Sequence, residues 1–382
     1  MRGGNNREFQ EIVKPSMSVR EEIMRLGGES IKKCYQCGIC TVVCPISKEF
    51  SLKIRMFARY IQLGLEDKIV KSLDPWLCYY CGDCSKNCPR QAKPGEGMMA
   101  LRRYLTSKYD WTGFSKILYQ SKIVGIIAII VIALITSLFI YLFHGPIIMD
   151  KVELNTFAPL HIIEKADHII FIILTLLLLT NLFKMYKFVM GNIKKSQLSI
   201  KTYIIEFIKV VPLNFFSQKM LGLCTNKRYW IIHLSIFFGY VTSFILFVIL
   251  LPCVHTNEPF LLFNPLSIVG IFATITLLYG IITSIYGRIK RNQPIWEYSH
   301  FTDWTFIILL LIITITGILT GIFRLIGLPM ATYLSYSIHL IADVPFLILM
   351  VPFAKWSHLL YRPFALYFER LIEISSLKGV KS

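Results

Sequence analysis

Acidic residues are scarce in this chain of 382 residues, which holds 23 Asp and Glu against 41 Lys and Arg and carries a formal net charge of +18. An excess of this sign is compatible with nucleic-acid binding. The basic residues, however, flank long apolar runs, so membrane topology and attraction to anionic lipid account for most of the excess. Low-complexity segments are lacking as well, and the charged N-terminus has no apolar signal segment. We therefore predict no nucleic-acid partner and no export of the N-terminal region.

Cysteine occurs at ten positions, and eight of these form two copies of one motif, C-x2-C-x2-C-x3-C-P. This run holds [4Fe–4S] clusters in two-cluster ferredoxins, where the fourth cysteine of each copy ligates the other cluster. We therefore predict that each cluster takes three cysteines from one copy and the last cysteine of the other. The predicted ligands are Cys34, Cys37, Cys40 and Cys88 for the first cluster, and Cys78, Cys81, Cys84 and Cys44 for the second.

A zinc site and disulfide bonds are the two alternatives for these cysteines. Zinc favours two separated pairs of ligands rather than a triplet followed by a single cysteine. Disulfides need neither the duplicated spacing nor the proline that follows each copy. The motif therefore favours iron–sulfur clusters, and the remaining cysteines, Cys224 and Cys253, are predicted to be dispensable for them.

Beyond Trp111 the sequence becomes strongly apolar, and 54% of the whole chain is hydrophobic. Residues 123–143 carry no charge, and a helix of that length crosses a hydrocarbon core of about 30 Å at about 1.5 Å per residue. Six spans are predicted, at about 123–143, 166–186, 229–251, 265–286, 304–323 and 334–355. The predicted fold is mainly α: an all-α, ferredoxin-like domain with two [4Fe–4S] clusters over residues 1–115, then a six-helix transmembrane cytochrome b bundle over residues 116–382.

Loop charge predicts the orientation of the chain in the membrane. Residues 184–228 hold nine Lys and Arg against the single acid Glu206, and residues 288–303 add three bases, whereas the alternate loops are poor in bases. By the positive-inside rule both basic loops face the cytoplasm. A reducing compartment also suits iron–sulfur thiolates. We predict a multi-pass protein of the cytoplasmic (inner) membrane, with the cluster domain and both termini inside.

Four histidines lie at matching depths of the predicted spans. His233 and His358 lie near the cytoplasmic ends of the third and sixth spans, and His168 and His339 lie near the outer ends of the second and sixth. Two neutral imidazoles on facing helices are what a bis-histidine haem b needs. The pattern predicts an inner haem on His233 and His358 and an outer haem on His168 and His339.

Ordinary interfacial histidines are the alternative, because hydrogen-bonded histidines are common at helix ends. Depth pairing on a chain that also holds clusters favours haem ligation by His233 and His358. For His168 the two interpretations weigh equally, and His255 and His161 compete with it.

The spacing of the last two histidines raises a question of phase. On a straight helix His339 and His358 lie about 28 Å apart along the axis but about 100° apart around it. Kinks at Pro345 and Pro352 would be needed to turn both toward haems.

One acid, Asp343, lies in the middle of the sixth predicted span, one helical turn after His339. An acid at membrane depth is costly and is a functional candidate by default. Quinol oxidation releases two protons and two electrons, so it needs a base beside an electron acceptor, and Asp343 and His339 are the candidates. The alternative is that Asp343 orients a haem-ligating histidine. Lys355 and Arg362, near His358, either pair with haem propionates or extend to the interface.

Residues 34–111 resemble the small C-type iron–sulfur subunit of heterodisulfide reductases. The first cysteine triplet, Gln62-Leu-Gly-Leu-Glu-Asp, Trp76-Leu-Cys and Asn87-Cys-Pro-Arg90 carry this likeness. Residues from about 165 onward resemble the E-type membrane cytochrome b of the same enzymes and the gamma chain of respiratory nitrate reductase. Arg228-Tyr-Trp-Ile-Ile-His233 with Gly239, His339, and Pro352-Phe-Ala-Lys-Trp-Ser-His358 carry the second likeness. A fusion in this order resembles the C-type membrane subunits of quinone-interacting membrane-bound oxidoreductase complexes.

The resemblance implies a role in sulfate respiration. Menaquinol would be oxidised in the membrane, and electrons would pass through one or two haems b and the two clusters to cytoplasmic subunits that hold FAD and iron–sulfur centres, and on toward adenylylsulfate reductase. Two features depart from the related families. Ser243 occupies the position of a second histidine in nitrate reductase gamma, so an outer haem needs another ligand such as His168 or is absent. No Cys-Cys-Gly motif is present, so the chain is not expected to reduce disulfides itself.

Two other classes of function fit the sequence. One is a membrane-anchored ferredoxin without haem, whose helices tether a soluble redox or transport complex. The other is an electron-fed ion pump, which needs several intramembrane charges where the sequence offers essentially Asp343 alone. A pyridine haemochrome assay separates the haem protein from the tether.

Overall fold

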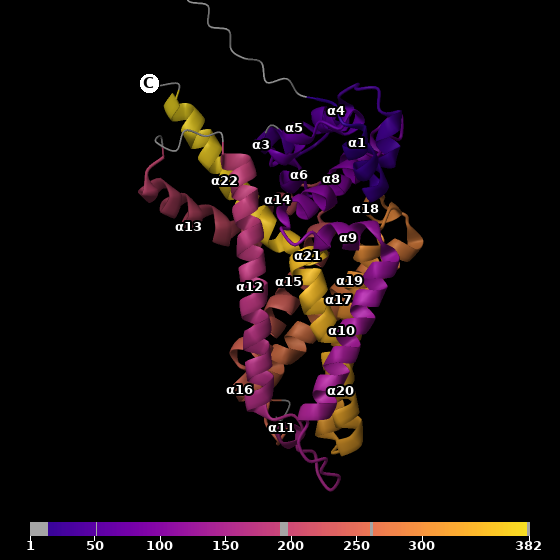
Figure 1. Cartoon of the computed structure of the whole chain (residues 1–382), viewed down its shortest axis with the longest axis vertical. Coiled ribbons are helices and arrows are strands. Elements are labelled where there is room, and N and C mark those ends of the chain that lie inside the picture. Colours follow the sequence, from indigo (N-terminus) through magenta and orange to yellow (C-terminus); the bar gives the residue numbers. More distant parts are fainter. Residues whose placement is uncertain (1–13, 51, 192–197, 260–262, 380–382) are drawn as a thin grey trace, which may run out of the picture.

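The computed structural model describes residues 14–50, 52–191, 198–259 and 263–379, and within these residues every regular element is a helix. A small N-terminal domain caps one end of an elongated helical bundle (Figure 1). The predicted mainly α fold is therefore confirmed.

Short helices and one long one build the N-terminal domain. They are α1 (Met17–Ile23), η1 (Met24–Gly28), η2 (Glu29–Lys33), α2 (Ile39–Val42), α3 (Ser47–Phe50), α4 (Ile54–Leu63), α5 (Glu66–Val70), α6 (Asp74–Leu77), α7 (Asp83–Lys86), α8 (Pro94–Tyr109) and α9 (Phe114–Gln120). Helix α8 is buried along almost its whole length and forms the centre of the domain.

Helix α4 shows how local sequence shapes this domain. Its apolar residues recur at helical spacing, and Ile54, Phe57 and Ile61 are buried on one face while Arg55 is exposed on the other. The helix ends at Gly64, whose φ of 62° lies in the left-handed region. A Cβ at this position would lie 1.9 Å from the backbone oxygen of Ser16, so only glycine fits.

Six long apolar helices form the bundle, as predicted. They are α10 (Lys122–Phe143), α12 (Leu160–Met190), α15 (Arg228–Phe244) continued by η4 (Ile245–Ile249), α17 (Pro265–Lys290), α19 (Phe301–Leu325), and α20 (Pro329–Pro345) continued by η5 (Phe346–Met350) and α21 (Val351–Phe353). Shorter elements join them: α11 (Leu154–Phe157), α13 (Ile200–Ser217), α14 (Lys219–Gly222), α16 (Leu251–Val254), α18 (Pro294–Glu297) and η6 (Lys355–Ser357), with α22 (His358–Gly379) last.

The outer surface of the bundle is that of a membrane protein. In α10 only Gly125 and Thr136 are fully buried, and most of its isoleucine and leucine side chains are exposed, while Ile129 and Ile132 are half-buried against the bundle. Such a large exposed apolar surface is stable in lipid, where every backbone hydrogen bond must be made within the helix. Helix α13 lies across the direction of the bundle (Figure 1), as an interfacial helix does.

The sixth span is not one straight helix. A π-helical turn follows Pro345, and the chain breaks at Ala354, where φ is −135° and ψ is −136°. His358 therefore begins a new helix, α22, that leaves the bundle direction (Figure 1). The helix is thus interrupted near Pro345 and Pro352, the two positions at which the sequence requires kinks if His339 and His358 are both to face haems.

The N-terminal domain and the bundle share one apolar core. The cluster of buried residues that contains Trp76 and Leu101 also contains Met185 of α12 and Tyr361 of α22. The ring centroids of Trp76 and Tyr361 lie 4.9 Å apart. The predicted boundary after residue 115 falls inside α9, which leads directly from this core into α10.

Candidate functional site

The two cysteine motifs adopt the same backbone conformation. Gln36 and Tyr80, at equivalent positions, have positive φ values of 68° and 55°, and the following glycines, Gly38 and Gly82, have φ values of 88° and 86°. Each glycine begins a single helical turn, α2 or α7. This shared conformation curls each loop around its first three cysteines.

The fourth cysteine of the first motif lies near the second motif. Cys44 interacts electrostatically with Cys78, whereas Cys40 interacts with Cys34 and Cys37 of its own copy. Cys84 interacts with Cys78, Cys81 and Cys44, and more weakly with Cys40. The arrangement is compatible with the predicted exchange of the fourth ligand between two clusters.

The thiols also bear on the two alternatives. All ten cysteines are free, so none is held in a disulfide. The preference for clusters over zinc therefore rests on the spacing of the cysteines, a triplet followed by a single cysteine in each copy.

Burial affects the ionisation of these thiols. It raises the pKa of the Cys40 thiol to about 11 and the pKa of the Cys84 thiol well above its ordinary value. Backbone N–H groups point at other sulfurs: Ala92 N lies 3.3 Å from Sγ of Cys88, and Tyr80 N lies 3.4 Å from Sγ of Cys78. Bound iron would stabilise the thiolates that burial alone disfavours, so the donor set fits iron–sulfur clusters.

The N-terminal region is a 4Fe–4S dicluster domain. Residues 30–92 match the family model with that description. The region is 37% identical over 101 residues to the C-type iron–sulfur subunit of the CoB–CoM heterodisulfide reductase of Methanopyrus kandleri. The aligned residues are 26% of this chain and 50% of the relative. It is 36% identical over 104 residues to an Archaeoglobus profundus protein that is named as similar to the same C-type subunit, 27% of this chain and 54% of the relative.

A third relative, the second C-type iron–sulfur subunit of the Methanocaldococcus jannaschii enzyme, is 40% identical over 80 residues, 21% of this chain and 42% of its own length. The chain thus spans about half the length of the curated relatives that it matches. The shared region is an iron–sulfur electron-transfer domain of an oxidoreductase family, and the present chain adds six helices that are long and apolar enough to cross a membrane.

Two of the predicted haem ligands lie side by side at the junction of this domain with the bundle. The ring centroids of His233 on α15 and His358 on α22 are 5.8 Å apart, and the ring planes are inclined by 76°. His233 Nδ1 donates to Oε1 of Gln218 at 2.6 Å, and His358 Nδ1 donates to the backbone carbonyl of Lys355. Each ring therefore keeps its Nε2 lone pair free for a metal.

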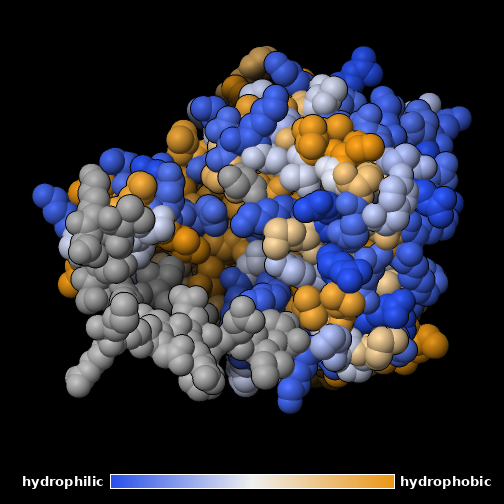
Figure 2. All heavy atoms as spheres, turned by 90° about the horizontal axis from the view of Figure 1, so that it is seen from above, coloured by the Kyte–Doolittle hydropathy of each residue, from blue (hydrophilic) through white to orange (hydrophobic). Residues whose placement is uncertain are grey.

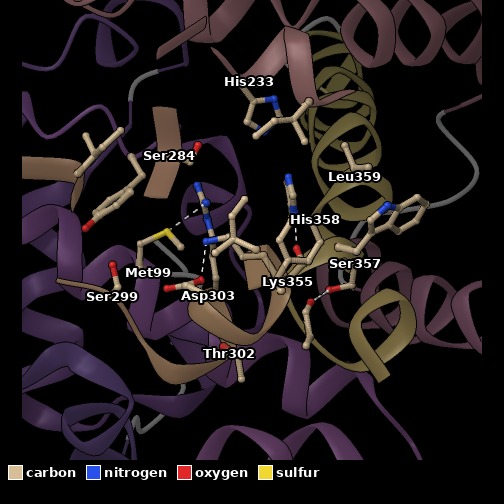
Figure 3. Close-up of a pocket in the computed structure, with 18 of the residues that line it drawn as sticks. Met99, His233, Ser284, Ser299, Thr302, Asp303, Lys355, Ser357, His358 and Leu359 are labelled. Carbon is tan, nitrogen blue, oxygen red and sulfur yellow. Dashed lines mark hydrogen bonds and ion pairs between the residues drawn. The ribbon is translucent and has the colours of Figure 1, made fainter. Parts of the chain in front are cut away.

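The two histidines line a cavity of about 230 Å³ between the N-terminal domain and the bundle. In Figure 3 both rings extend into the same space. His233 and His358 would hold a haem iron through the Nε2 atoms of their two neighbouring rings, and the haem would supply one-electron transfer there. Burial lowers the pKa of His358, which keeps its ring neutral. These residues fit a bis-histidine haem.

The predicted outer pair is arranged differently. His168 is an exposed side chain on α12, and its neighbour Asp167 lines a smaller cavity of about 70 Å³. His339 Nδ1 donates to the backbone oxygen of Ile313 at 2.9 Å, on α19. The outer haem on His168 and His339 stays a prediction. His255, named as a competitor, is buried and bonds the backbone oxygen of Ala158 at 2.7 Å.

Asp343 has acidic and phenolic neighbours that the sequence did not reveal. It interacts electrostatically with Asp167 on α12 and with Tyr240 and Tyr336. The observed helices also include Asp303 at the start of α19. Asp343 is therefore not the one acid within the long apolar helices: Asp167 lies inside the predicted second span, and Asp303 lies just before the predicted fifth.

The two predicted propionate partners have other contacts. Lys355 forms an ion pair with Asp303 at 2.6 Å. Arg362 donates from Nη2 to the carbonyl of Cys78 at 3.2 Å and lies over the ring of Tyr79 at 4.4 Å. Arg362 thus joins α22, the helix that begins with His358, to the second cysteine motif.

Several site residues come from parts of the chain that no motif marks. The Cys224 thiol is buried and hydrogen-bonded to Cys81, and Thr225 donates its hydroxyl to Asp83 at 2.9 Å. The loop before α15 therefore packs against the second cysteine motif. No sequence signal links residues about 140 positions apart, although the polar run 217–228 between two apolar helices indicates a loop at this end of the bundle.

Proposed function

We propose that this protein is the membrane electron-transfer subunit of a quinone-interacting oxidoreductase. Menaquinol is the proposed reductant, and haem b and the two [4Fe–4S] clusters are the proposed carriers toward cytoplasmic subunits with FAD and iron–sulfur centres. The iron–sulfur domain and its relatives support electron transfer. The observation that carries the haem and quinol part of the proposal is the pair His233 and His358 beside the second motif.

A bound haem would supply a one-electron carrier at this junction. The chain would hold it through Nε2 of His233 and His358, because Gln218 and the carbonyl of Lys355 accept the Nδ1 protons and fix both rings. Burial among aromatic and apolar side chains excludes water and favours neutral imidazoles.

The route toward the clusters follows from packing. Arg362 lies one helical turn after His358 on α22 and hydrogen-bonds the backbone of Cys78. The second cluster is therefore proposed as the acceptor nearest the bundle. The first motif lies on the opposite side of the route, with Cys37 exposed to solvent. Electrons would leave there for the partner subunits, and in a sulfate-respiring cell for adenylylsulfate reductase.

The quinol site is proposed in the outer half of the bundle. Asp343 and His339 remain the candidate proton acceptors, and Asp167 is a neighbouring carboxylate that would receive a proton next. An apolar cavity of about 70 Å³ lined by Asp167 and Tyr336 opens beside them. Proton release on the outer side and electron transfer inward would separate charge across the membrane. Moving one elementary charge against a membrane potential of 100 mV stores about 2.3 kcal/mol.

The proposed topology places the iron–sulfur domain and both termini in the cytoplasm. The domain lies at the bundle end where α12 and α17 end, and Lys93 of the domain pairs with Glu297 of α18 at 2.5 Å. The positive-inside rule assigns that end to the cytoplasm. Protease accessibility in membrane vesicles tests this topology. Cleavage within the first motif is expected in inside-out vesicles, and cleavage there only in right-side-out vesicles would contradict the topology.

The deciding experiment is a pyridine haemochrome assay on the purified protein and on two variants. We expect His233→Ala and His358→Ala to remove the same haem, because each leaves one axial position empty, while both proteins still insert. In the parent, a quinol analogue should reduce the haem, and Asp343→Asn should slow that reduction at least tenfold with the spectrum unchanged. A parent protein with clusters but no haem would instead establish the tethered ferredoxin.

A further inference from the structure

The cavity beside His233 and His358 has an unusual charge balance. Five basic side chains line it, and Asp303 is the one acid among the described lining residues. The basic residues are Arg102 and Arg103 of the iron–sulfur domain, Arg288 of α17, Lys355, and Arg362 of α22. Burying cations without counter-charge is costly, so their partners need to be identified one by one.

Asp303 balances two of the five. Its Oδ1 pairs with Lys355 at 2.6 Å, and its Oδ2 pairs with Arg103 at 3.2 Å and accepts the backbone N–H of His300 at 3.1 Å. Both oxygens are thereby occupied, and Figure 3 shows this carboxylate beside Lys355. Asp303 also interacts electrostatically with Arg288 but forms no ion pair with it.

The other three arginines form no ion pair within the described part of the chain. Arg102 donates from Nε to the carbonyl of Pro75 at 2.6 Å, and Arg288 donates from Nη1 to the carbonyl of Ser284 at 3.0 Å. Arg362 uses Nη2 for the Cys78 carbonyl. Neutral carbonyls satisfy single N–H groups without supplying a counter-charge. Arg102 also hydrogen-bonds the side chain of Cys78, and Arg102 and Arg362 both interact electrostatically with Cys78 and Tyr79.

Each of these arginines also keeps a buried donor without a partner. The unpartnered atoms are Nη2 of Arg102, Nε of Arg288 and Nε of Arg362, and Nε1 of Trp356 joins them on the same cavity wall. Arg102 is only 6% exposed. An unsatisfied buried donor costs about 1–3 kcal/mol, and more when it is charged, so four around one cavity indicate a ligand that accepts hydrogen bonds.

We propose that Arg102, Arg288 and Arg362 form an oxyanion site that holds the propionate carboxylates of the haem bound by His233 and His358. This inference rests on the proposed function. Guanidinium groups bind carboxylates through two parallel hydrogen bonds, which matches donors of this kind. Arg362 follows His358 by four residues on α22 and so lies on the same helix face. Lys355, engaged by Asp303, is replaced in this role by Arg102 and Arg288.

The site is shared between the two parts of the chain. Arg288 and Arg362 belong to the bundle end, whereas Arg102 is on α8 of the iron–sulfur domain. The iron–sulfur domain therefore completes the haem site as well as accepting its electrons. The contact between the iron–sulfur domain and the bundle therefore helps to set the reduction potential of the haem.

The test is a visible redox titration of the full-length protein and of Arg102→Met and Arg288→Met. Removal of a positive charge beside the propionates disfavours the added electron. We expect the haem to remain bound and its reduction to become at least tenfold less favourable, a shift of about 59 mV to lower potential for one electron. Arg102→Lys should recover part of the shift. Arg59→Met, which alters an exposed arginine of α4 outside the cavity, is the matched control.

The outcomes separate the two levels of the proposal. If the haem in both Arg102→Met and Arg288→Met has the same reduction potential as in the control, the oxyanion site is overturned and the proposed function stays intact. The same result with loss of tightly bound anionic phospholipid would assign the donors to a lipid headgroup and also overturn it. A parent protein without haem would overturn the proposed function itself. Because Arg288 lies outside the iron–sulfur domain, its variant keeps the test valid if Arg102→Met disturbs α6.

Discussion

The two cysteine motifs have the same spacing and the same loop conformation, but they lie in different surroundings. In the first motif Tyr35 is 57% exposed and Val42 is 79% exposed, and Cys37 also faces solvent. In the second, Tyr79 and Cys78 are 8% and 6% exposed. The first part of the first motif therefore faces outward, and the first part of the second motif is buried, although Lys86, Asn87 and Pro89 of the second motif are exposed.

Single positions within the motifs carry this difference. Gln36 of the first copy hydrogen-bonds the side chain of Gln62 at 3.2 Å, whereas its counterpart Tyr80 donates to the buried carboxyl of Glu96. Asp83 of the second copy accepts from Thr225 of the bundle. The duplicated motif is thus divided into an inward copy that meets the bundle and an outward copy available to a partner.

Seen from the domain end, the surface is largely hydrophilic with separate apolar patches (Figure 2). Tyr35, Ile39 and Val42 are exposed apolar residues of the first motif, and Arg55 and Arg90 lie beside them. A partner surface with an apolar centre and a carboxylate rim would complement this face.

Loss of one ligand from each copy should have the largest effect. Cys37→Ala and Cys81→Ala should each remove one cluster, about four of about eight irons. Only Cys81→Ala should also prevent quinol-driven reduction of the remaining cluster, because the second cluster lies between the bundle and the first. Iron analysis and EPR of the reduced protein measure both effects. Cys253→Ala is the control, and two intact EPR signals in Cys37→Ala would refute the ligand assignment.

The carboxyl under the second copy should make that copy sensitive to pH. Burial raises the pKa of Glu96 from 4.5 to about 7, although the Tyr80 hydroxyl and Arg103 favour the charged form. Because the folded-state pKa is raised, the neutral acid is favoured in the fold. The free energy of unfolding should therefore fall as pH rises from about 4.5 through about 7, by up to about 3 kcal/mol.

Glu96→Gln should remove this pH dependence. Relative to the parent, the variant should gain more stability at pH 8, where the parent's buried acid is ionised, than at pH 5. Loss of cluster absorbance during thermal unfolding at the two pH values measures it. Gln62→Ala, beside the first copy, is the control and should leave the pH profile of the parent unchanged, since Gln36 and Gln62 do not titrate. An unaltered profile in Glu96→Gln would show that the acid is charged in the fold.

The equivalent glycines offer a matched pair of intermediate effect. Gly38→Ala and Gly82→Ala both place a side chain at positive φ, at a cost of about 1–2 kcal/mol. A Cβ at position 82 would also lie 2.6 Å from Cβ of Pro294 in the bundle, whereas at position 38 the nearest atom is Cδ of Arg55 at 3.6 Å. We expect Gly82→Ala to cost about 1–3 kcal/mol more. Equal unfolding temperatures for the two variants would mean that the second copy does not meet the bundle so closely.

The smallest effect is expected on the outward face. Val42→Asp places a carboxylate at the centre of the apolar patch and should weaken binding of the co-purified partner subunits about tenfold, or about 1.4 kcal/mol. Cluster content should stay at that of the parent. Met17→Asp, at an exposed position on α1, is the control, and dissociation constants from surface-immobilised protein give the comparison. Unchanged affinity in Val42→Asp would place the partner elsewhere.

Local patterns in the sequence account for the features that depend on short range. The cysteine spacing sets both loops, Gly64 ends α4, and runs free of charge produce six long helices. Each depends on residues a few positions apart, where propensity, glycine conformation and hydrophobic length act alone. The depth match of His233 and His358 belongs here too, because both lie near the ends of apolar runs at one side of the bundle.

Long-range packing selects the copy of the motif that meets the bundle and the groups that complete the junction. Gln218 holds His233, Asp303 joins Arg103 to Lys355, and Cys224 lies against Cys81, although such partners are far apart in the chain. No period or spacing encodes these contacts, because they arise when side chains of separate helices fill one packed core. The sequence does indicate a kink near Ala354, because Pro352 lies two residues before it, but the direction in which α22 continues depends on the packing of the helices.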